Sequence, residues 1–183
     1  FKLDFEPAMF LPLFCLFVCN LDEVKEIDTD YYYLDIQEEN IKWFQDNFMN
    51  YDSVAIIRNP NLFIDNMITS FGNSCVHQRV NYINKDATQS GRNSHPMQAL
   101  LEISDQPVSQ ENGSWSRSFR ADDAYKLLFQ KDEYFSCERE YRFILKDKKL
   151  ESPTEMEVNI SAPIHIMGIA DLLSKSPIPK SVK

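Results

Sequence analysis

The chain has 183 residues, a formal net charge of -9 and a pI of about 4.8. Its hydrophobic fraction of 43% and aromatic fraction of 13% exclude a disordered chain and are enough to build a buried core. The negative charge disfavours nonspecific nucleic-acid binding. With only four glycines, the sequence has no phosphate-binding loop of the Walker or dinucleotide type.

The cysteines and the first apolar run bear on the cellular compartment. The four cysteines form no CxxC pair and, with three scattered histidines, no recognisable zinc set. We interpret them as buried free thiols in a reducing cytoplasm. The apolar run at 8–19 is about half as long as a membrane span and follows Asp4 and Glu6 rather than a basic flank. We therefore expect a cytoplasmic protein without a membrane segment. We also expect an N-terminal segment to be missing, because the chain begins at Phe1.

The first part of the chain predicts a strand, a helix and a second strand. Pro12 interrupts the apolar run, so Leu13–Cys19 is interpreted as a buried strand. Ile36–Met49 is amphipathic and predicts a helix, and Ser53–Arg58 is rich in β-branched residues and predicts a short strand. The apolar stripe of the helix consists of Ile41, Phe44 and Phe48.

Asn59 and Pro60 are typical of a helix start, because Asn caps the first turn and Pro fits the first helical position. Gly72 is a natural stop for this helix. Cys75–Ile83 alternates and predicts a strand. The apolar face of the helix consists of Phe63, Met67, Ile68 and Phe71.

The middle of the chain is polar and rich in turn residues. We expect loop insertions within 84–118, with a short helix at Met97–Ile103 and a flexible loop at Ser104–Ser118 that contains Trp115. Ala121–Lys131 predicts a helix whose N-terminal acids complement the helix dipole.

The densest group of ionisable residues lies in Tyr134–Leu145. As a strand, this segment places Glu138, Glu140 and Arg142 on one face. Two acids and a base in a row must be solvated, paired or used, because an isolated buried charge is costly.

The last part of the chain predicts strands at Met156–Ile160 and Pro163–Ile169, then a short helix and a flexible tail at 174–183. Together these elements predict an α+β fold in a single domain over 1–183. We expect a mixed, mostly antiparallel sheet of about six strands with three or four packed helices.

Several short motifs occur in a recognisable order. They are Pro12–Phe17 followed by Leu21–Glu23, Asn50–Ile57 before a helix, Val80–Ile83, and Phe135–Arg142. Together they resemble the bacterial abortive-infection family of the AbiGi type and a related family of unknown function. In both families a strand with a Cys-Phe core, a Tyr-Gly-x-Gly-Ile strand, a Val-x-Tyr strand and a Glu-x-Glu-Trp/Tyr-Arg strand follow this order. The resemblance covers roughly Leu11 to Gly168.

The resemblance implies phage defence or a toxin–antitoxin-like system, and its motif order is similar to that of the ADP-ribosyltransferase fold. By that analogy NAD is the substrate, Glu140 is the catalytic carboxylate and Glu138 orients the acceptor. A fixed carboxylate stabilises the positive charge that develops on ribose when the nicotinamide bond breaks. Arg142 would hold a phosphate or clamp the acids, and Tyr82 would stack on a base or on nicotinamide.

Other interpretations of the same residues stay open. The Glu138, Glu140 and Arg142 face is also explained by a structural ion pair on a solvated strand, which we favour, or by a partner-binding surface. The alternative function is a non-catalytic module that binds a protein partner (a toxin, an antitoxin or a phage factor) through acidic and aromatic surface, with Tyr31–Tyr33 and Trp115 as candidates. An adaptor domain unrelated to defence is a third possibility. Three further residues are interpreted as structural: His77, His165 and, as an alternative to stacking, Tyr82.

Overall fold

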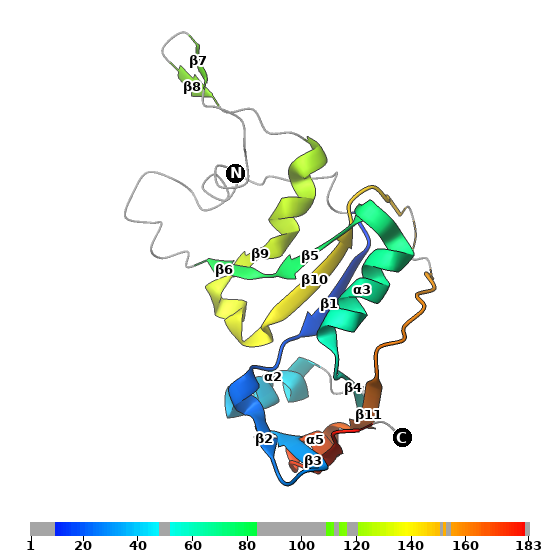
Figure 1. The fold of residues 1–183 in the computed structure, drawn as a ribbon. Helices are drawn as coiled ribbons and strands as arrows, with labels where there is room; N and C mark the ends of the chain where they lie inside the picture. Colours follow the sequence, from blue (N-terminus) through cyan, green and yellow to red (C-terminus); the bar gives the residue numbers. More distant parts are fainter. Residues whose placement is uncertain are drawn as a thin grey trace. The chain divides into compact units, whose positions relative to one another are not determined.

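The computed structural model describes residues 10–47, 52–83, 109–111, 114–116, 121–150, 152 and 155–181, with side chains at all of these except 38, 44–45, 109–111, 114–116 and 121–124. The chain divides into two compact units, which are described separately (Figure 1). Unit 1 comprises 1–16, 74–136 and 140–155, and unit 2 comprises 17–73, 137–139 and 156–183.

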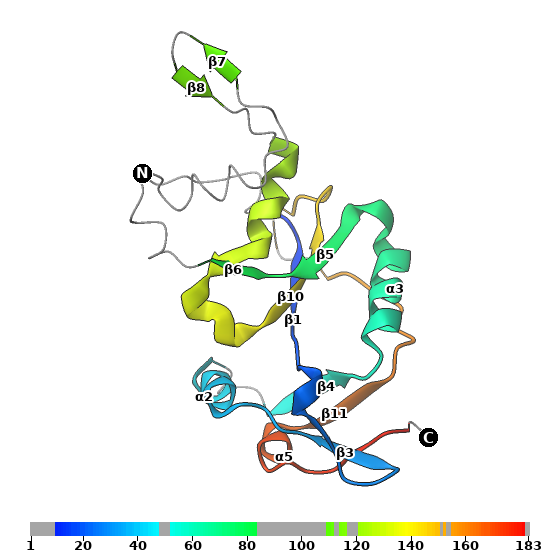
Figure 2. The same cartoon turned by 60° about the vertical axis from the view of Figure 1, so that its left-hand side comes forward.

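A three-stranded sheet forms the centre of unit 1 (Figure 2). Its strand order is β1 (Leu13–Phe17), β10 (Glu140–Leu145) and β5 (Cys75–Arg79). β10 runs antiparallel to β5, with Tyr141 opposite Arg79 and Leu145 opposite Cys75. As the middle strand, β10 is covered on both edges, and its second half is the most buried segment among the described residues of the unit. The exposed fractions there are 2% for Phe143, 0% for Ile144 and 4% for Leu145.

Unit 1 contains further short elements. β6 (Asn81–Ile83) pairs in parallel with β9 (Gln130–Asp132), and β7 (Ser109–Glu111) forms a hairpin with β8 (Ser114–Ser116). The helix predicted at 121–131 forms as the 3-10 helix η4 (Ala121–Phe129). A second 3-10 helix, η5 (Glu133–Glu138), follows β9, and its last two residues belong to unit 2. The helix predicted at Met97–Ile103 lies outside the described residues.

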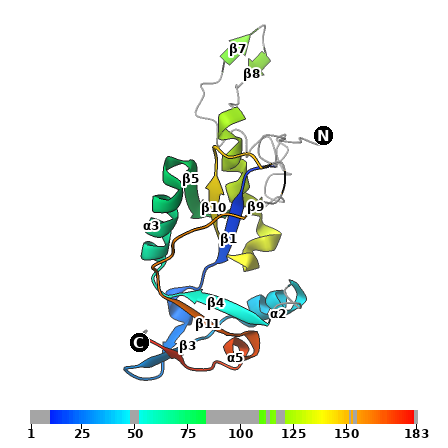
Figure 3. The same ribbon diagram turned by 90° about the vertical axis from the view of Figure 1, so that its right-hand side faces the viewer.

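Unit 2 contains two small sheets. β3 (Tyr31–Leu34) lies between β2 (Val24–Glu26) and β12 (Ile178–Pro179), and β4 (Ser53–Ile57) pairs antiparallel with β11 (Ile164–Gly168) (Figure 3). The helices are η1 (Leu21–Glu23), α2 (Glu38–Asn47), α3 (Pro60–Phe71), η2 (Gly72–Ser74), whose last residue belongs to unit 1, and α5 (Ile169–Leu173). The core of the unit consists of Leu34, Ile36, Leu172 and Ile178.

Helix α3 forms as the sequence predicts. The side chain of Asn59 accepts a hydrogen bond from the backbone N of Leu62 at 3.0 Å, and Pro60 occupies the first turn. Gly72 ends the helix with φ +60°, which favours glycine. Of the predicted apolar face, Phe63 and Met67 are buried and Phe71 is half-buried, whereas Ile68 is 39% exposed. The stripe predicted for α2 cannot be followed in full, because the side chains of Phe44 and Phe48 lie outside the described residues.

The coexistence of helices and mostly antiparallel strands confirms the predicted α+β class. The strands are distributed over several small sheets. The predicted tail contains the ordered strand β12, in which Ile178 is fully buried. Among the residues that the structure describes, no helix is long and apolar enough to cross a membrane.

Further sequence predictions are wrong in detail. The strand predicted at Cys75–Ile83 is divided into β5 and β6, which belong to different sheets. The strand predicted at Leu13–Cys19 is not buried, because β1 is an edge strand with Leu13 41% and Phe14 47% exposed. Met156–Ile160 forms no strand. Instead, the chain that follows is held at Ser161 and Ala162, whose backbone N atoms donate to Oδ1 of Asn66.

The strand predicted over Tyr134–Leu145 begins only at Glu140. Glu138 is the last residue of η5, and Arg139, which lies between Glu138 and Glu140, has φ +42°. Strand alternation therefore does not extend back to Glu138, so the prediction that Glu138, Glu140 and Arg142 share one strand face is wrong.

Candidate functional site

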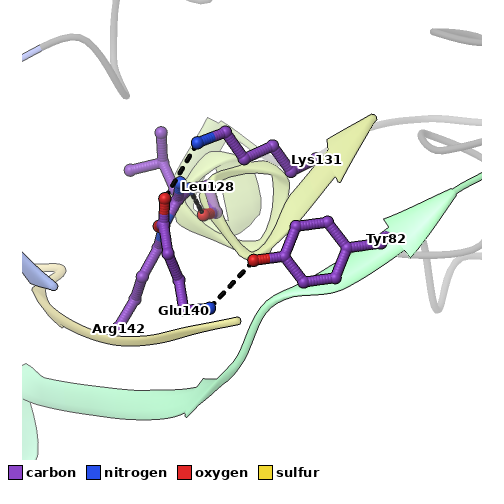
Figure 4. Close-up of polar contacts among 5 residues, drawn as sticks. All are labelled: Tyr82, Leu128, Lys131, Glu140 and Arg142. Atoms are coloured by element: carbon purple, nitrogen blue, oxygen red, sulfur yellow. Dashed lines mark hydrogen bonds and ion pairs between the residues drawn. The ribbon is translucent and has the colours of Figure 1, made fainter. Parts of the chain in front are cut away.

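Three of the four predicted site residues lie together in unit 1 (Figure 4). Glu140 begins β10, and Arg142 lies two residues further on the same face of that strand. Tyr82 comes from β6 and Lys131 from β9, the two strands that pair in parallel. The group Tyr82, Lys131, Glu140 and Arg142 is called the Glu140 cluster below.

Both carboxylate oxygens of Glu140 face a cation. Oε1 accepts a hydrogen bond from Nζ of Lys131 at 2.8 Å, and Oε2 accepts one from Nε of Arg142 at 2.5 Å. The exposed fractions of these side chains are 13% for Glu140, 12% for Arg142 and 24% for Lys131. The ion pair between Glu140 and Arg142 that we favoured from the sequence is therefore present. It is mostly buried rather than solvated, and Lys131 is part of it.

Arg142 and Tyr82 tie this ion pair to the backbone. Burial alone would lower the pKa of Arg142, but the hydrogen bond and the charge of Glu140 raise it above its ordinary value. The guanidinium also donates through NH1 to the backbone O of Leu128. The hydroxyl of Tyr82 accepts a hydrogen bond from the backbone N of Glu140 at 2.8 Å, which fixes the start of β10.

The thiol of Cys15 lies beside the Glu140 cluster. Cys15 is exposed rather than buried as the sequence predicts, but desolvation of its thiol and then the negative charge of Glu140 raise its pKa to about 11, although Arg142 acts in the opposite direction. The thiol is therefore protonated near neutral pH and is not a ready nucleophile. The sequence did not single out Cys15 or Lys131, because both contacts to Glu140 are made between separate strands and have no fixed spacing in the chain.

Glu138, the fourth predicted site residue, belongs to unit 2 and is not a member of the Glu140 cluster. Only 7% of its surface is exposed. The side chains of Glu138 and Glu140 are thus both largely buried, so the interpretation of this acidic pair as a partner-binding surface is wrong.

Arg139 forms a second polar cluster, in unit 2. NH1 donates to Oε2 of Glu23 at 2.5 Å, while NH2 donates to Oδ1 of Asn40 at 2.7 Å and to Oε1 of Gln37 at 2.9 Å. Asn40 is fully buried, and its amide also donates to the backbone O of Cys137. This cluster holds Cys137–Arg139 in unit 2 and explains why the predicted strand is interrupted there.

The carboxylate of Glu23 is charged in this setting. Burial alone would raise its pKa, but the hydrogen bond from Arg139, a backbone hydrogen bond from Asn20 and the charge of Arg139 hold the pKa below its ordinary value. Nothing in the sequence predicts this pair, because its members are 116 residues apart.

His77 and His165, the two histidines among the described residues, fit the structural interpretation. His77 Nδ1 lies 2.6 Å from the hydroxyl of Tyr141, and its ring stacks on those of Tyr141 and Phe143. His165 is half-buried in β11. In the described part of the chain, no group of three or more His, Cys, Asp or Glu side chains could hold a metal ion.

The chemistry available to the Glu140 cluster follows from its charges. One carboxylate is shared by two cations, so the cluster as a whole carries an excess positive charge close to a protonated thiol. Such an arrangement stabilises the contact between the strands. It can bind a substrate only if Lys131 or Arg142 moves away from Glu140. We found no family model, curated protein or solved structure that matches the chain.

Proposed function

We propose that the protein is a non-catalytic binding module of a bacterial phage-defence or toxin–antitoxin-like system. One observation supports the non-catalytic role above all: both oxygens of Glu140 are engaged by Lys131 and Arg142. A carboxylate that stabilises a developing ribose cation must turn an oxygen towards the substrate. The bacterial defence setting is supported only by the order of motifs that resembles the abortive-infection family.

The distribution of charge supports binding as the activity. Unit 2 contains 14 acidic and 7 basic residues, whereas unit 1 contains 14 acidic and 12 basic residues. Most of the net charge of -9 therefore belongs to unit 2. A net negative charge attracts a partner of the opposite sign and speeds its association, so a basic protein partner fits this unit.

A nicotinamide-release assay tests the non-catalytic role. The full-length chain is incubated with NAD, and free nicotinamide is measured for the wild type and for Glu140→Gln. We expect no release from either protein, with folding checked by circular dichroism. Release by the wild type that is lost in Glu140→Gln would contradict the proposal.

An affinity experiment tests the binding role. The immobilised full-length chain is exposed to lysates of its bacterial host before and after phage infection. We expect it to retain one protein in stoichiometric amount and to release it at about 0.5 M salt, where charges are screened within a few ångströms. Failure to retain any stoichiometric protein from both lysates would contradict a binding module.

An ADP-ribosyltransferase remains the second candidate, and one observation favours it. Tyr82, Glu140 and Arg142, all expected near NAD, do lie in one cluster. In this proposal Arg142 turns to a phosphate of NAD and frees Oε2 of Glu140. The nicotinamide assay decides between the candidates, because only the transferase releases nicotinamide in a manner that depends on Glu140.

A further inference from the structure

The two-stranded sheet of β4 and β11 has two unlike faces. Residues opposite each other across a ladder share a face, and the pairs here are Ile164 with Ile57, Ile166 with Ala55, and Gly168 with Ser53. We call these six residues the outer face. The opposite face contains Val54, Ile56 and Met167, which pack against the core of unit 2.

The outer face is apolar and open. Ile166 is 71% exposed, Ile164 is 40% exposed and Ala55 is exposed as well. Burial of an isoleucine side chain is favourable, so a contiguous strip of this kind is costly to leave in water. Single exposed apolar residues are normal, but a strip that crosses two strands marks an interaction surface.

The edge of β11 is open too. Within the described part of the chain, β4 and β11 pair with each other and with no third strand. The backbone N of Arg58 donates a hydrogen bond to the O of Pro163, and the N of Ile169 donates one to the O of Asp52. These two bonds show which positions along β11 are hydrogen-bonded to β4. At the intervening positions, which include Ile164 and Ile166, the backbone N–H and C=O groups therefore point away from β4. No charged residue or proline protects β11 from pairing with another strand.

Two carboxylates end the apolar strip. Oδ2 of Asp171 lies 3.1 Å from the position that a Cβ atom would take at Gly168, which places it on the outer-face side. At the same end, the hydroxyl of Ser53 donates to Oδ1 of Asp52 at 2.8 Å. Isoleucines followed by acids are complementary to a ligand with apolar side chains followed by a basic one.

We propose that the outer face and the open edge of β11 bind an extended segment of a protein partner. The segment adds a strand beside β11, places alternate apolar side chains next to Ile164 and Ile166, and carries a Lys or Arg opposite Asp171 and Asp52. This inference rests on the proposed binding function and names the class of partner. A second copy of the chain fits less well, because it would bring two strongly acidic units together.

The test is selection from a phage-displayed library of short random peptides with the full-length chain as bait. We expect the selected peptides to alternate β-branched or aromatic residues and to carry Lys or Arg at one end. Their affinity, measured by fluorescence anisotropy, falls about tenfold or more in Ile166→Asp, which places a charge at the centre of the strip. Asp171→Asn lowers both the affinity and its dependence on salt.

Controls keep the result interpretable. Leu21→Asp changes another highly exposed apolar residue of unit 2 and leaves peptide affinity unchanged. Ile166→Thr keeps β-branching, and it serves as the second variant if Ile166→Asp fails to fold.

Three results would overturn the inference. The first is a selection that enriches no peptide. The second is a set of peptides that bind the folded Ile166→Asp or Ile166→Thr protein as tightly as the wild type. The third is a wild-type dimer that the substitution Ile166→Asp dissociates. The last result would assign the face to a second copy. The nicotinamide assay separates this failure from that of the proposed function, because nicotinamide release contradicts a non-catalytic module whatever binds at β11.

Discussion

Removing the carboxylate of Glu140 is expected to destabilise unit 1 strongly. Glu140→Ala leaves two mostly buried cations, Arg142 and Lys131, without their counter-charge. Removing one partner of a buried ion pair costs about 3–5 kcal/mol. Arg142 keeps the backbone O of Leu128, and Lys131 with 24% exposure reaches water, so we expect a loss near the lower limit, about 3 kcal/mol.

A second substitution separates the charge effect from simple loss of packing. Glu140→Leu combined with Arg142→Met replaces this ion pair by apolar side chains of similar size, a change that is often close to neutral. Lys131 also loses Glu140 in the double variant, but at 24% exposure it reaches water. We expect the double variant to be about 2 kcal/mol more stable than the sum of its single variants predicts. Such coupling is the sign of an ion pair whose members depend on each other.

Urea unfolding measures both effects. With a slope of about 2 kcal/mol per molar urea, a loss of 3 kcal/mol lowers the midpoint by about 1.5 M. Amide hydrogen exchange in β10 and β4 shows whether the loss is confined to unit 1. A midpoint for Glu140→Ala within about 0.3 M of the wild type would refute the reasoning, as would strict additivity in the double variant.

Three further changes test other parts of the structure. Arg139→Leu leaves Glu23 buried without its cation and should cost about 3–5 kcal/mol in urea unfolding. The pKa of Glu23 is lower in the folded protein than in the unfolded chain, so its ion pair with Arg139 stabilises the wild type fully above about pH 4.5. This stabilisation is lost as the pH falls through the folded pKa, and Arg139→Leu should lack this acid dependence. Ile178→Ala removes a fully buried side chain and should cost about 2–5 kcal/mol, and an unchanged Tm would show that β12 does not contribute to the core. Cys15, with a pKa of about 11, should be only about 0.1% thiolate at pH 8 and react slowly with iodoacetamide, and Glu140→Gln should speed the reaction. Labelling at the rate of a free thiol would contradict the assigned environment of Cys15.

The elements that the sequence predicted well are those with local signals. Asn59, Pro60 and Gly72 act within a turn of their own positions, so they indicate α3 without knowledge of the rest of the fold. β4 and β11 are β-branched runs whose residue types favour a strand wherever the partner lies. Strand alternation predicts that Glu140 and Arg142 share a face, whereas the presence of Tyr82 beside them was expected only from the family resemblance.

The features that the sequence did not predict depend on contacts between distant segments. The break at Arg139 exists because its guanidinium is bound by Glu23, Gln37 and Asn40, and no spacing rule connects these positions. Lys131 reaches Glu140 from another strand, a contact that requires the strand register. The exposure of Leu13 follows from the edge position of β1, and a single apolar run carries no information on strand order.

The order of strands in unit 1 has a consequence for synthesis on the ribosome. β10 lies between β1 and β5 in the sheet but follows both in the chain, so neither flanking strand finds its partner until residue 145 has left the exit tunnel. Until then the nascent chain exposes the apolar residues of β1 and an unpaired β5, the kind of surface that chaperones bind. Premature termination before β10 would therefore release a product with two strands that lack their common neighbour and a strong tendency to aggregate.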